Sequence, residues 1–211
     1  MTMAAERLSE HLKGFTAVKA PLSVVVPAVE SSLMRWGPVR TIKLSSAPEA
    51  LEYLLPLKSF TTRFLVIGLG NWSLLVTDMR GENAYVDGIA ISEKLDCLGF
   101  GIVAQERRRE FQVIKAGRKV RHVQSLLDFD SWYYREEGEM QEFEDAAECL
   151  HRNKSDRLSA LAVMQYYQRF TGMVLPAWGT LEADAFVGLE RSAHEMRVPL
   201  TCFETINDIS T

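Results

Sequence analysis

Cysteine and histidine are the side chains in this sequence that could pair as nucleophile and base or bind zinc. The cysteines are Cys97, Cys149 and Cys202, and Cys149 lies two residues before His151. A structural zinc site needs about four ligands in paired clusters, which this spacing does not provide. A Cys–His pair could assemble in space without a local motif, with His122 or His151 as the base. The sequence therefore leaves a Cys–His hydrolase open, favours small buried thiols and predicts no metal site.

Two short motifs match parts of known chemical signatures. Residues 68–70, Gly-Leu-Gly, follow an apolar segment, but the dinucleotide fingerprint needs a third glycine where Ser73 stands. His194-Glu195 begins the zinc-protease pattern H-E-x-x-H, but Val198 replaces the second histidine. We therefore predict a hairpin turn at residues 68–71 and no cofactor. A pair of carboxylates doing acid–base chemistry stays an alternative, because the sequence cannot show which acids share a cleft.

Charged residues separate into two blocks, and this is the clearest non-random feature of the chain. Residues 107–121 hold seven basic side chains against the single acid Glu110: Arg107, Arg108, Arg109, Lys115, Arg118, Lys119 and Arg121. Residues 136–148 hold seven acids and no basic residue: Glu136, Glu137, Glu139, Glu142, Glu144, Asp145 and Glu148. The two blocks could neutralise each other across neighbouring strands. Alternatively, the acidic block could steer a basic protein to the surface, or the basic block could contact phosphates.

An aromatic segment, Trp132-Tyr133-Tyr134, lies between the two charged blocks. Strand alternation places Trp132 and Tyr134 on one face and Tyr133 on the other. One face is expected in the core, and the other could supply an aromatic anchor at an interface. The candidate partner-binding residues are therefore Glu136, Glu137, Glu139, Glu142 and Glu144 together with Trp132 and Tyr134.

The composition is that of an ordinary globular protein. The chain has 211 residues, of which 47% are hydrophobic and 25% charged, which excludes disordered and collagen-like classes. The formal net charge of −4 gives no reason to expect a nucleic-acid partner. No apolar run approaches the roughly 18–20 residues of a membrane span. Three scattered cysteines and an N-terminus without a signal-peptide pattern predict a cytoplasmic protein.

The pattern of apolar residues predicts a single domain over residues 1–211, with residues 1–20 as a possible N-terminal helical appendage. Short strands are expected at 39–44, 64–67, 72–76, 102–104, 111–114, 120–127, from 132 and at 198–203. Helices are expected at 4–13, 27–36, from the capping box Ser46–Glu49, at 85–98, at about 156–171 and near 181–189. The predicted fold is α+β, a mostly antiparallel sheet of five to seven strands with helices packed on one side.

Several features between Ile67 and Gly172 are shared with a known group of proteins. The first is an apolar strand followed by Gly70-Asn71-Trp72. Next come an Arg-bearing strand from Arg118 to Ser125, an aspartate-rich turn and an aromatic strand at Trp132. The last are Phe143-Glu144 and a helix that starts at Asp156-Arg157, carries Tyr166-Tyr167 and ends at Gly172. In these features the chain resembles a group of uncharacterised bacterial proteins. The resemblance covers about half of the chain, implies a bacterial cytosolic protein and assigns no functional residue.

These observations favour a non-enzymatic protein-binding module over an enzyme. Immunity proteins that neutralise a bacterial toxin are similar in size, acidity and α+β composition. The expected function is therefore binding of a basic protein through the acidic surface, as an immunity-type inhibitor would do. A small hydrolase with a Cys–His or carboxylate site is the alternative. The sequence does not indicate an oligomeric state.

Overall fold

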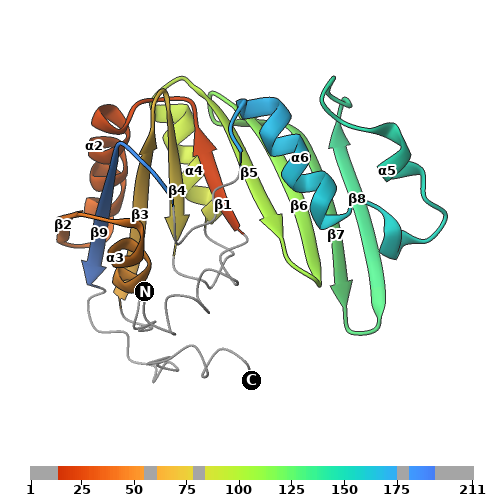
Figure 1. Cartoon of the computed structure of the whole chain (residues 1–211), viewed down its shortest axis with the longest axis horizontal. Helices are drawn as coiled ribbons and strands as arrows, with labels where there is room; N and C mark the ends of the chain where they lie inside the picture. Colours follow the sequence, from red (N-terminus) through yellow and green to blue (C-terminus); the bar gives the residue numbers. More distant parts are fainter. Residues whose placement is uncertain (1–13, 55–60, 78–83, 175–180, 193–211) are drawn as a thin grey trace.

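Nine strands in the described part of the chain form one antiparallel sheet. The computed structural model describes residues 14–54, 61–77, 84–174 and 181–192. The strand order is β2-β9-β3-β4-β1-β5-β6-β7-β8, so β2 and β8 are the two edges (Figure 1). The prediction of an α+β fold with a mostly antiparallel sheet is confirmed, and the predicted number of strands is too low. No helix among the described residues is long and apolar enough to cross a membrane.

The elements have the following bounds. The strands are β1 (Gly14–Val18), β2 (Val39–Leu44), β3 (Thr61–Leu69), β4 (Trp72–Thr77), β5 (Leu98–Ala104), β6 (Arg108–Lys115), β7 (Arg118–Asp128), β8 (Ser131–Gly138) and β9 (Ala185–Ser192). The helices are α2 (Leu22–Leu33), α3 (Ala47–Tyr53), α4 (Ala84–Lys94), α5 (Ala146–Leu150) and α6 (Ala160–Thr171), with 3-10 turns at Met34–Trp36 and Lys154–Asp156.

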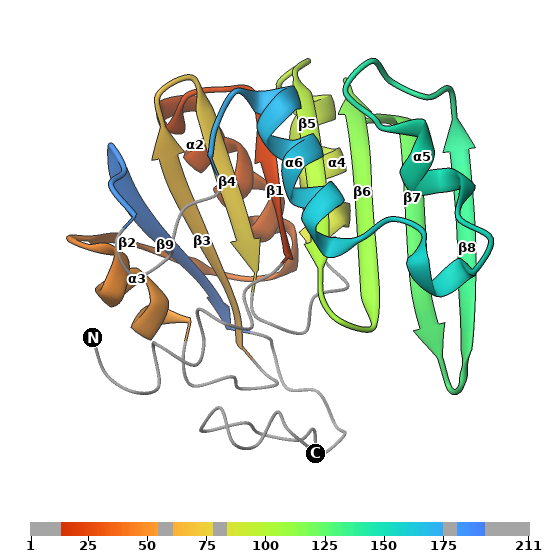
Figure 2. The same ribbon diagram turned by 45° about the vertical axis from the view of Figure 1, so that its right-hand side comes forward.

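Helices cover both faces of the sheet, so the prediction of helices on one side is wrong. Figures 1 and 2 show α6 across β5 and β6 on one face and α4 behind β1 and β5 on the other. The reason lies in β3 and β4, whose central residues are apolar on both faces. Leu65 and Ile67 pack into the core beneath α3 and α6, whereas Phe64 and Val66 pack against α2 and α4. Such a strand needs cover on both sides.

Two strands that the sequence did not predict complete the sheet. β1 lies between β4 and β5, and β9 lies between β2 and β3. The predicted helix near residues 181–189 is wrong, because most of this segment forms β9. Phe186 and Leu189 enter opposite cores, a requirement of tertiary packing that overrides the local pattern. The predicted helix at 4–13 and strand at 198–203 lie outside the described residues.

Strands β5 to β8 form an antiparallel meander, and each contains one of the strands predicted at 102–104, 111–114, 120–127 and from 132. Consecutive strands pair along their length, with one irregularity between Val113 and Ile114 opposite β7. Beneath α6 lies an aromatic cluster in which the Phe100 and Phe111 rings stack 5.8 Å apart. The helix begins after Ser159, whose hydroxyl accepts from the Ala162 N–H, and ends at Gly172 with a positive φ of 75°.

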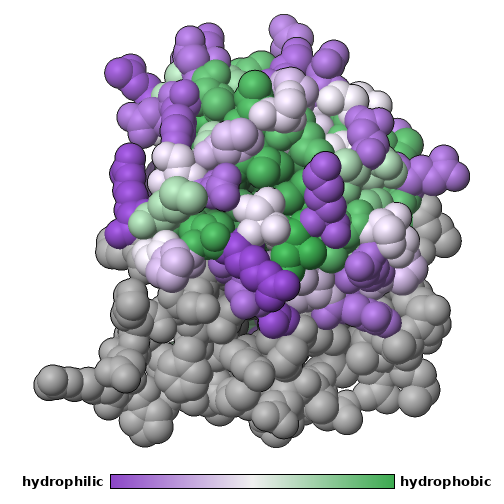
Figure 3. All heavy atoms as spheres, turned by 90° about the vertical axis from the view of Figure 1, so that its left-hand side faces the viewer, coloured by the Kyte–Doolittle hydropathy of each residue, from purple (hydrophilic) through white to green (hydrophobic). Residues whose placement is uncertain are grey.

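The two edges of the sheet differ in surface character. Figure 3 views the molecule from the β2 side and shows hydrophobic residues among hydrophilic ones. Val24 on α2 and Met34 in the 3-10 turn after it are exposed. At the opposite edge, β8 presents mainly charged side chains after Tyr134. This charged edge contains the acidic block.

Candidate functional site

A buried ion pair connects the basic and acidic blocks. Arg121 on β7 is 2% exposed, and its Nη2 donates to Glu144 (2.8 Å) and Glu136 (3.0 Å). Its Nη1 donates to the Gly138 carbonyl (2.8 Å), while Glu144 also accepts from the Gln141 N–H (2.8 Å). We call the contacts of Arg121 with these residues the Arg121 latch. The latch ties the loop that follows β8 back onto the sheet.

The latch divides the predicted acidic residues into buried and exposed ones. The Glu144 side chain is fully buried, so this residue is not available to a partner. Glu136 and Glu137 are 48% and 43% exposed, although they pair with Arg121 and Arg135 respectively. Glu139 and Glu142 are exposed, and no cation among the described residues pairs with them. We call Glu136, Glu137, Glu139 and Glu142 the acidic surface.

Trp132 and Tyr134 share a face of β8, as the alternation predicts, but both are covered in part. The Arg109 guanidinium lies 4.6 Å from the Trp132 ring centroid, and that of Arg157 lies 5.0 Å from the Tyr134 ring centroid. The Arg157 contact attaches the segment after α5 to β8, and the Arg109 contact joins β6 to β8. Tyr133, on the opposite face, is 56% exposed. Tyr133 is therefore the more accessible aromatic of this segment.

The basic block is only partly neutralised by the acidic block. Arg121 pairs across strands, but Arg108 pairs with Glu110 inside its own block (2.9 Å). Arg107 and Arg109 donate to backbone carbonyls of Phe129 and Ser155. The remaining three, Lys115, Arg118 and Lys119, are exposed around the β6–β7 turn. Neutralisation across strands therefore holds for Arg121, and within the acidic surface Glu139 and Glu142 pair with no cation among the described residues.

A second buried charge, Glu110, organises the face of the meander opposite α6. Its Oε1 accepts from Gln112 (3.1 Å) and from His122 Nε2 (2.8 Å). Its Oε2 accepts from Gln124 (2.8 Å) and Arg108 (2.9 Å). Burial alone would raise the pKa of Glu110, but these donors and the Arg108 charge outweigh it and lower the pKa to about 2. We call Glu110 and its four partners the Glu110 hub.

The structure separates the residues of the Cys–His alternative. Cys149 contacts the face of β8 that carries Tyr134, whereas His122 points to the opposite face towards Glu110. Burial raises the pKa of the Cys149 thiol, which is the reverse of what an activated nucleophile needs. His151 is exposed at the end of α5. No group of His, Cys, Asp and Glu among the described residues is arranged to hold a metal ion.

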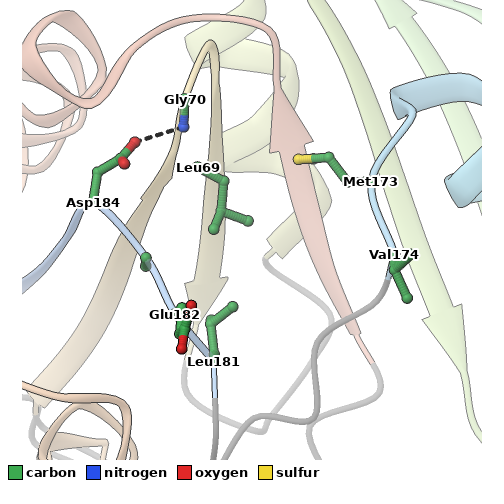
Figure 4. Close-up of a pocket in the computed structure, with 8 residues that line it drawn as sticks. Leu69, Gly70, Met173, Val174, Leu181, Glu182 and Asp184 are labelled. Carbon is green, nitrogen blue, oxygen red and sulfur yellow. Dashed lines mark hydrogen bonds between the residues drawn. The ribbon is translucent and has the colours of Figure 1, made fainter.

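A groove of about 570 Å³ opens at the tip of the β3–β4 hairpin. Figure 4 shows Leu69 and Leu181 on one side of it and Met173 on the other. At one end, Asp184 accepts a hydrogen bond from the Gly70 N–H (2.6 Å) and so closes the predicted hairpin turn. The lining is mainly apolar, and none of its residues belongs to the charged blocks.

Comparison of the chain with protein-family models, curated proteins and solved structures finds no match.

Sequence reasoning found the charged blocks but missed the latch and the hub. Arg121 is one of seven basic residues in its block, and nothing in its neighbourhood along the chain marks it as buried. The sequence does contain a signal for the hub. Polar residues occupy every second position of β6 (Glu110 and Gln112) and of β7 (His122 and Gln124), so each pair lies on one face of its strand. Recognising that these four meet requires the strand register, which the sequence alone does not supply.

Proposed function

We propose that the protein is a cytoplasmic, non-enzymatic binding module that docks a basic protein through the acidic surface. The observation that carries this proposal is the Arg121 latch. It holds the loop after β8 with one buried carboxylate, Glu144, and leaves the carboxylates of the acidic surface exposed. An ordered acidic patch in which Glu139 and Glu142 pair with no cation among the described residues steers basic partners and favours their binding. An immunity-type inhibitor of a basic toxin would use such a patch.

The test is a charge-reversal variant, Glu137→Lys with Glu139→Lys and Glu142→Lys. The matched control reverses three exposed acids elsewhere, Glu52→Lys, Glu106→Lys and Asp128→Lys. Tagged chains are used to capture proteins from the source organism at low and high salt, with mass spectrometry as the readout. We expect the native chain and the control to capture the same basic protein at low salt only, because exposed charges are screened.

The charge-reversal variant should lose this protein while its melting temperature stays close to that of the native chain. Exposed ion pairs contribute about 0–1 kcal/mol each, so their loss should hardly affect stability. Equal capture by the native chain and the charge-reversal variant would refute the acidic surface as the docking site. Equal loss in both variants would show that total charge, and not this surface, drives the binding.

A further inference from the structure

Strand β8 is an open edge of the sheet. It pairs with β7 from Ser131 to Gly138 without a register shift, and none of the described strands lies on its other side. Beyond the hydrogen bonds between β7 and β8, one main-chain group of β8 has a hydrogen-bond partner among the described residues. It is the Gly138 carbonyl, which accepts from Arg121. An edge of this kind presents a row of unpaired N–H and C=O groups.

This edge is held in place, so a partner would meet a preformed strand. The contacts of Arg109 and Arg157 fix the aromatic face of β8, and the Arg121 latch fixes its end. From Arg135 to Gly138 every residue is exposed. A strand that is already ordered loses little conformational entropy when another strand joins it.

The charges along β8 favour one kind of strand. Glu136 and Glu137 alternate, so one carboxylate lies on each face of the sheet beside the open edge. Arg121 pairs with Glu136 and Arg135 with Glu137, yet the two carboxylates stay 48% and 43% exposed. An added strand with basic residues at consecutive positions would place a cation opposite a carboxylate on both faces. The other edge, β2, carries exposed Arg40 and Lys43 and no acid. The same basic strand would therefore be repelled from β2.

We infer that the basic partner of the acidic surface binds by adding an extended, basic segment to the β8 edge as a tenth strand. This inference rests on the proposed function and specifies its mode. Main-chain hydrogen bonds to β8 would supply affinity, and Glu136, Glu137 and the exposed Tyr133 would select the side chains. Acidic segments are disfavoured, because they would bring carboxylates beside Glu136 and Glu137.

The test uses a short synthetic peptide, acetyl-Thr-Val-Lys-Arg-Val-Thr-Val-amide, titrated into the isotope-labelled full-length protein. Backbone NMR shifts report where the peptide binds. A matched peptide carries N-methyl groups on alternate backbone nitrogens, which keep its charge and remove its ability to pair as a strand. We expect the plain peptide to shift the amides of residues 131–138 and not those of 39–44. We expect the methylated peptide to bind roughly tenfold more weakly or worse.

The remaining outcomes are distinguishable. Equal binding by both peptides, or shifts confined to residues 139–142, would overturn strand addition while leaving the acidic surface as a charged docking site. Lack of binding by the plain peptide would also overturn strand addition, and the capture experiment would judge the proposed function separately. Growth of particle mass with protein concentration in light scattering, together with shifts of the amides of residues 131–138, would show that the edge pairs with another copy of the chain and would contradict a foreign partner.

Discussion

At the scale of single residues, two carboxylates in the described part of the chain are buried in different surroundings, those of Glu110 and Glu144. Glu144 forms an ion pair with Arg121, whereas the two carboxylate oxygens of Glu110 accept hydrogen bonds from four donors. A buried carboxylate with this many donors stays ionised, because each donor stabilises the charged form. The folded state therefore binds the Glu110 proton less tightly than the unfolded chain does. This difference couples folding stability to pH.

We predict that Glu110→Gln destabilises the protein at neutral pH and removes part of its acid sensitivity. The pKa of Glu110 falls from 4.5 to about 2 on folding. Such a depressed pKa contributes stability that is fully present above pH 4.5 and is lost as the pH falls towards 2. The contribution is on the order of 3 kcal/mol. Urea unfolding measured across this pH range should show native and variant stabilities converging towards pH 2.

The control for this prediction is Glu106→Gln, which changes an exposed acid in the neighbouring β5–β6 turn. It should follow the native pH profile. A Glu110→Gln stability deficit that stays constant from pH 4.5 to 2 would show that the side chain acts through packing and not through its charge.

At the scale of elements, the latch turns an irregular segment into a defined surface. The loop after β8 is attached by hydrogen bonds of Arg121 and Gln141 to Glu144, and by the Tyr166 hydroxyl, which accepts from the Asp145 N–H (2.9 Å). Removing one member of a buried ion pair leaves the other charged and unpaired, which costs about 3–5 kcal/mol. The exposed acids of the acidic surface depend on this attachment for their positions.

We predict that Arg121→Leu destabilises the protein and increases hydrogen exchange at Gln141 and its neighbours more than in β3 and β4. The double variant Arg121→Leu with Glu144→Leu should be more stable than the sum of the two single changes, because no unpaired charge remains. The measurement is a double-mutant cycle by chemical denaturation, with hydrogen exchange read by NMR. Additive single effects, or uniform exchange throughout the sheet, would contradict the latch.

Elements with strong local signals could be predicted from the sequence, and those defined by distant partners could not. Ser46 caps α3 as the capping box predicts, and the turn at Gly70 joins β3 to β4. By contrast, β1 and β9 exist because they fill positions between strands far away in the chain. Gly88 shows the same limit: a Cβ there would lie 2.4 Å from the Thr16 Cγ2, so α4 needs a glycine to approach β1. The exposed acids of the candidate site could be predicted from the charge pattern of the sequence, and the buried pair of Arg121 and Glu144 could not.

At the scale of the whole molecule, the last described strand joins two earlier parts of the sheet. β9 pairs with β2 on one side and with β3 on the other. Pairing across such long stretches of chain carries a large loop-closure cost. The β3–β4 hairpin, in contrast, needs only a short turn. We therefore expect the hairpin to form before β9 is inserted.

Two leucine substitutions test this order of events. Leu189→Ala in β9 and Leu74→Ala in β4 each truncate a fully buried side chain, with an expected cost of about 2–5 kcal/mol. Stopped-flow kinetics should show Leu189→Ala acting mainly on the unfolding rate and Leu74→Ala mainly on the folding rate. Equal effects of both changes on the folding rate would indicate that β9 is already in place at the transition state.

The Glu110 hub also has a consequence for the alignment of strands. A backbone ladder accepts many alignments, but a shift of β7 by one residue turns every side chain to the opposite face. His122 and Gln124 would then enter the aromatic cluster around Phe100 and Phe111, and Glu110 would lose two of its four donors. Misaligned pairings therefore carry a penalty that an all-apolar sheet would lack. The buried charge of Glu110 therefore favours the observed register of β7 against β6 over shifted ones.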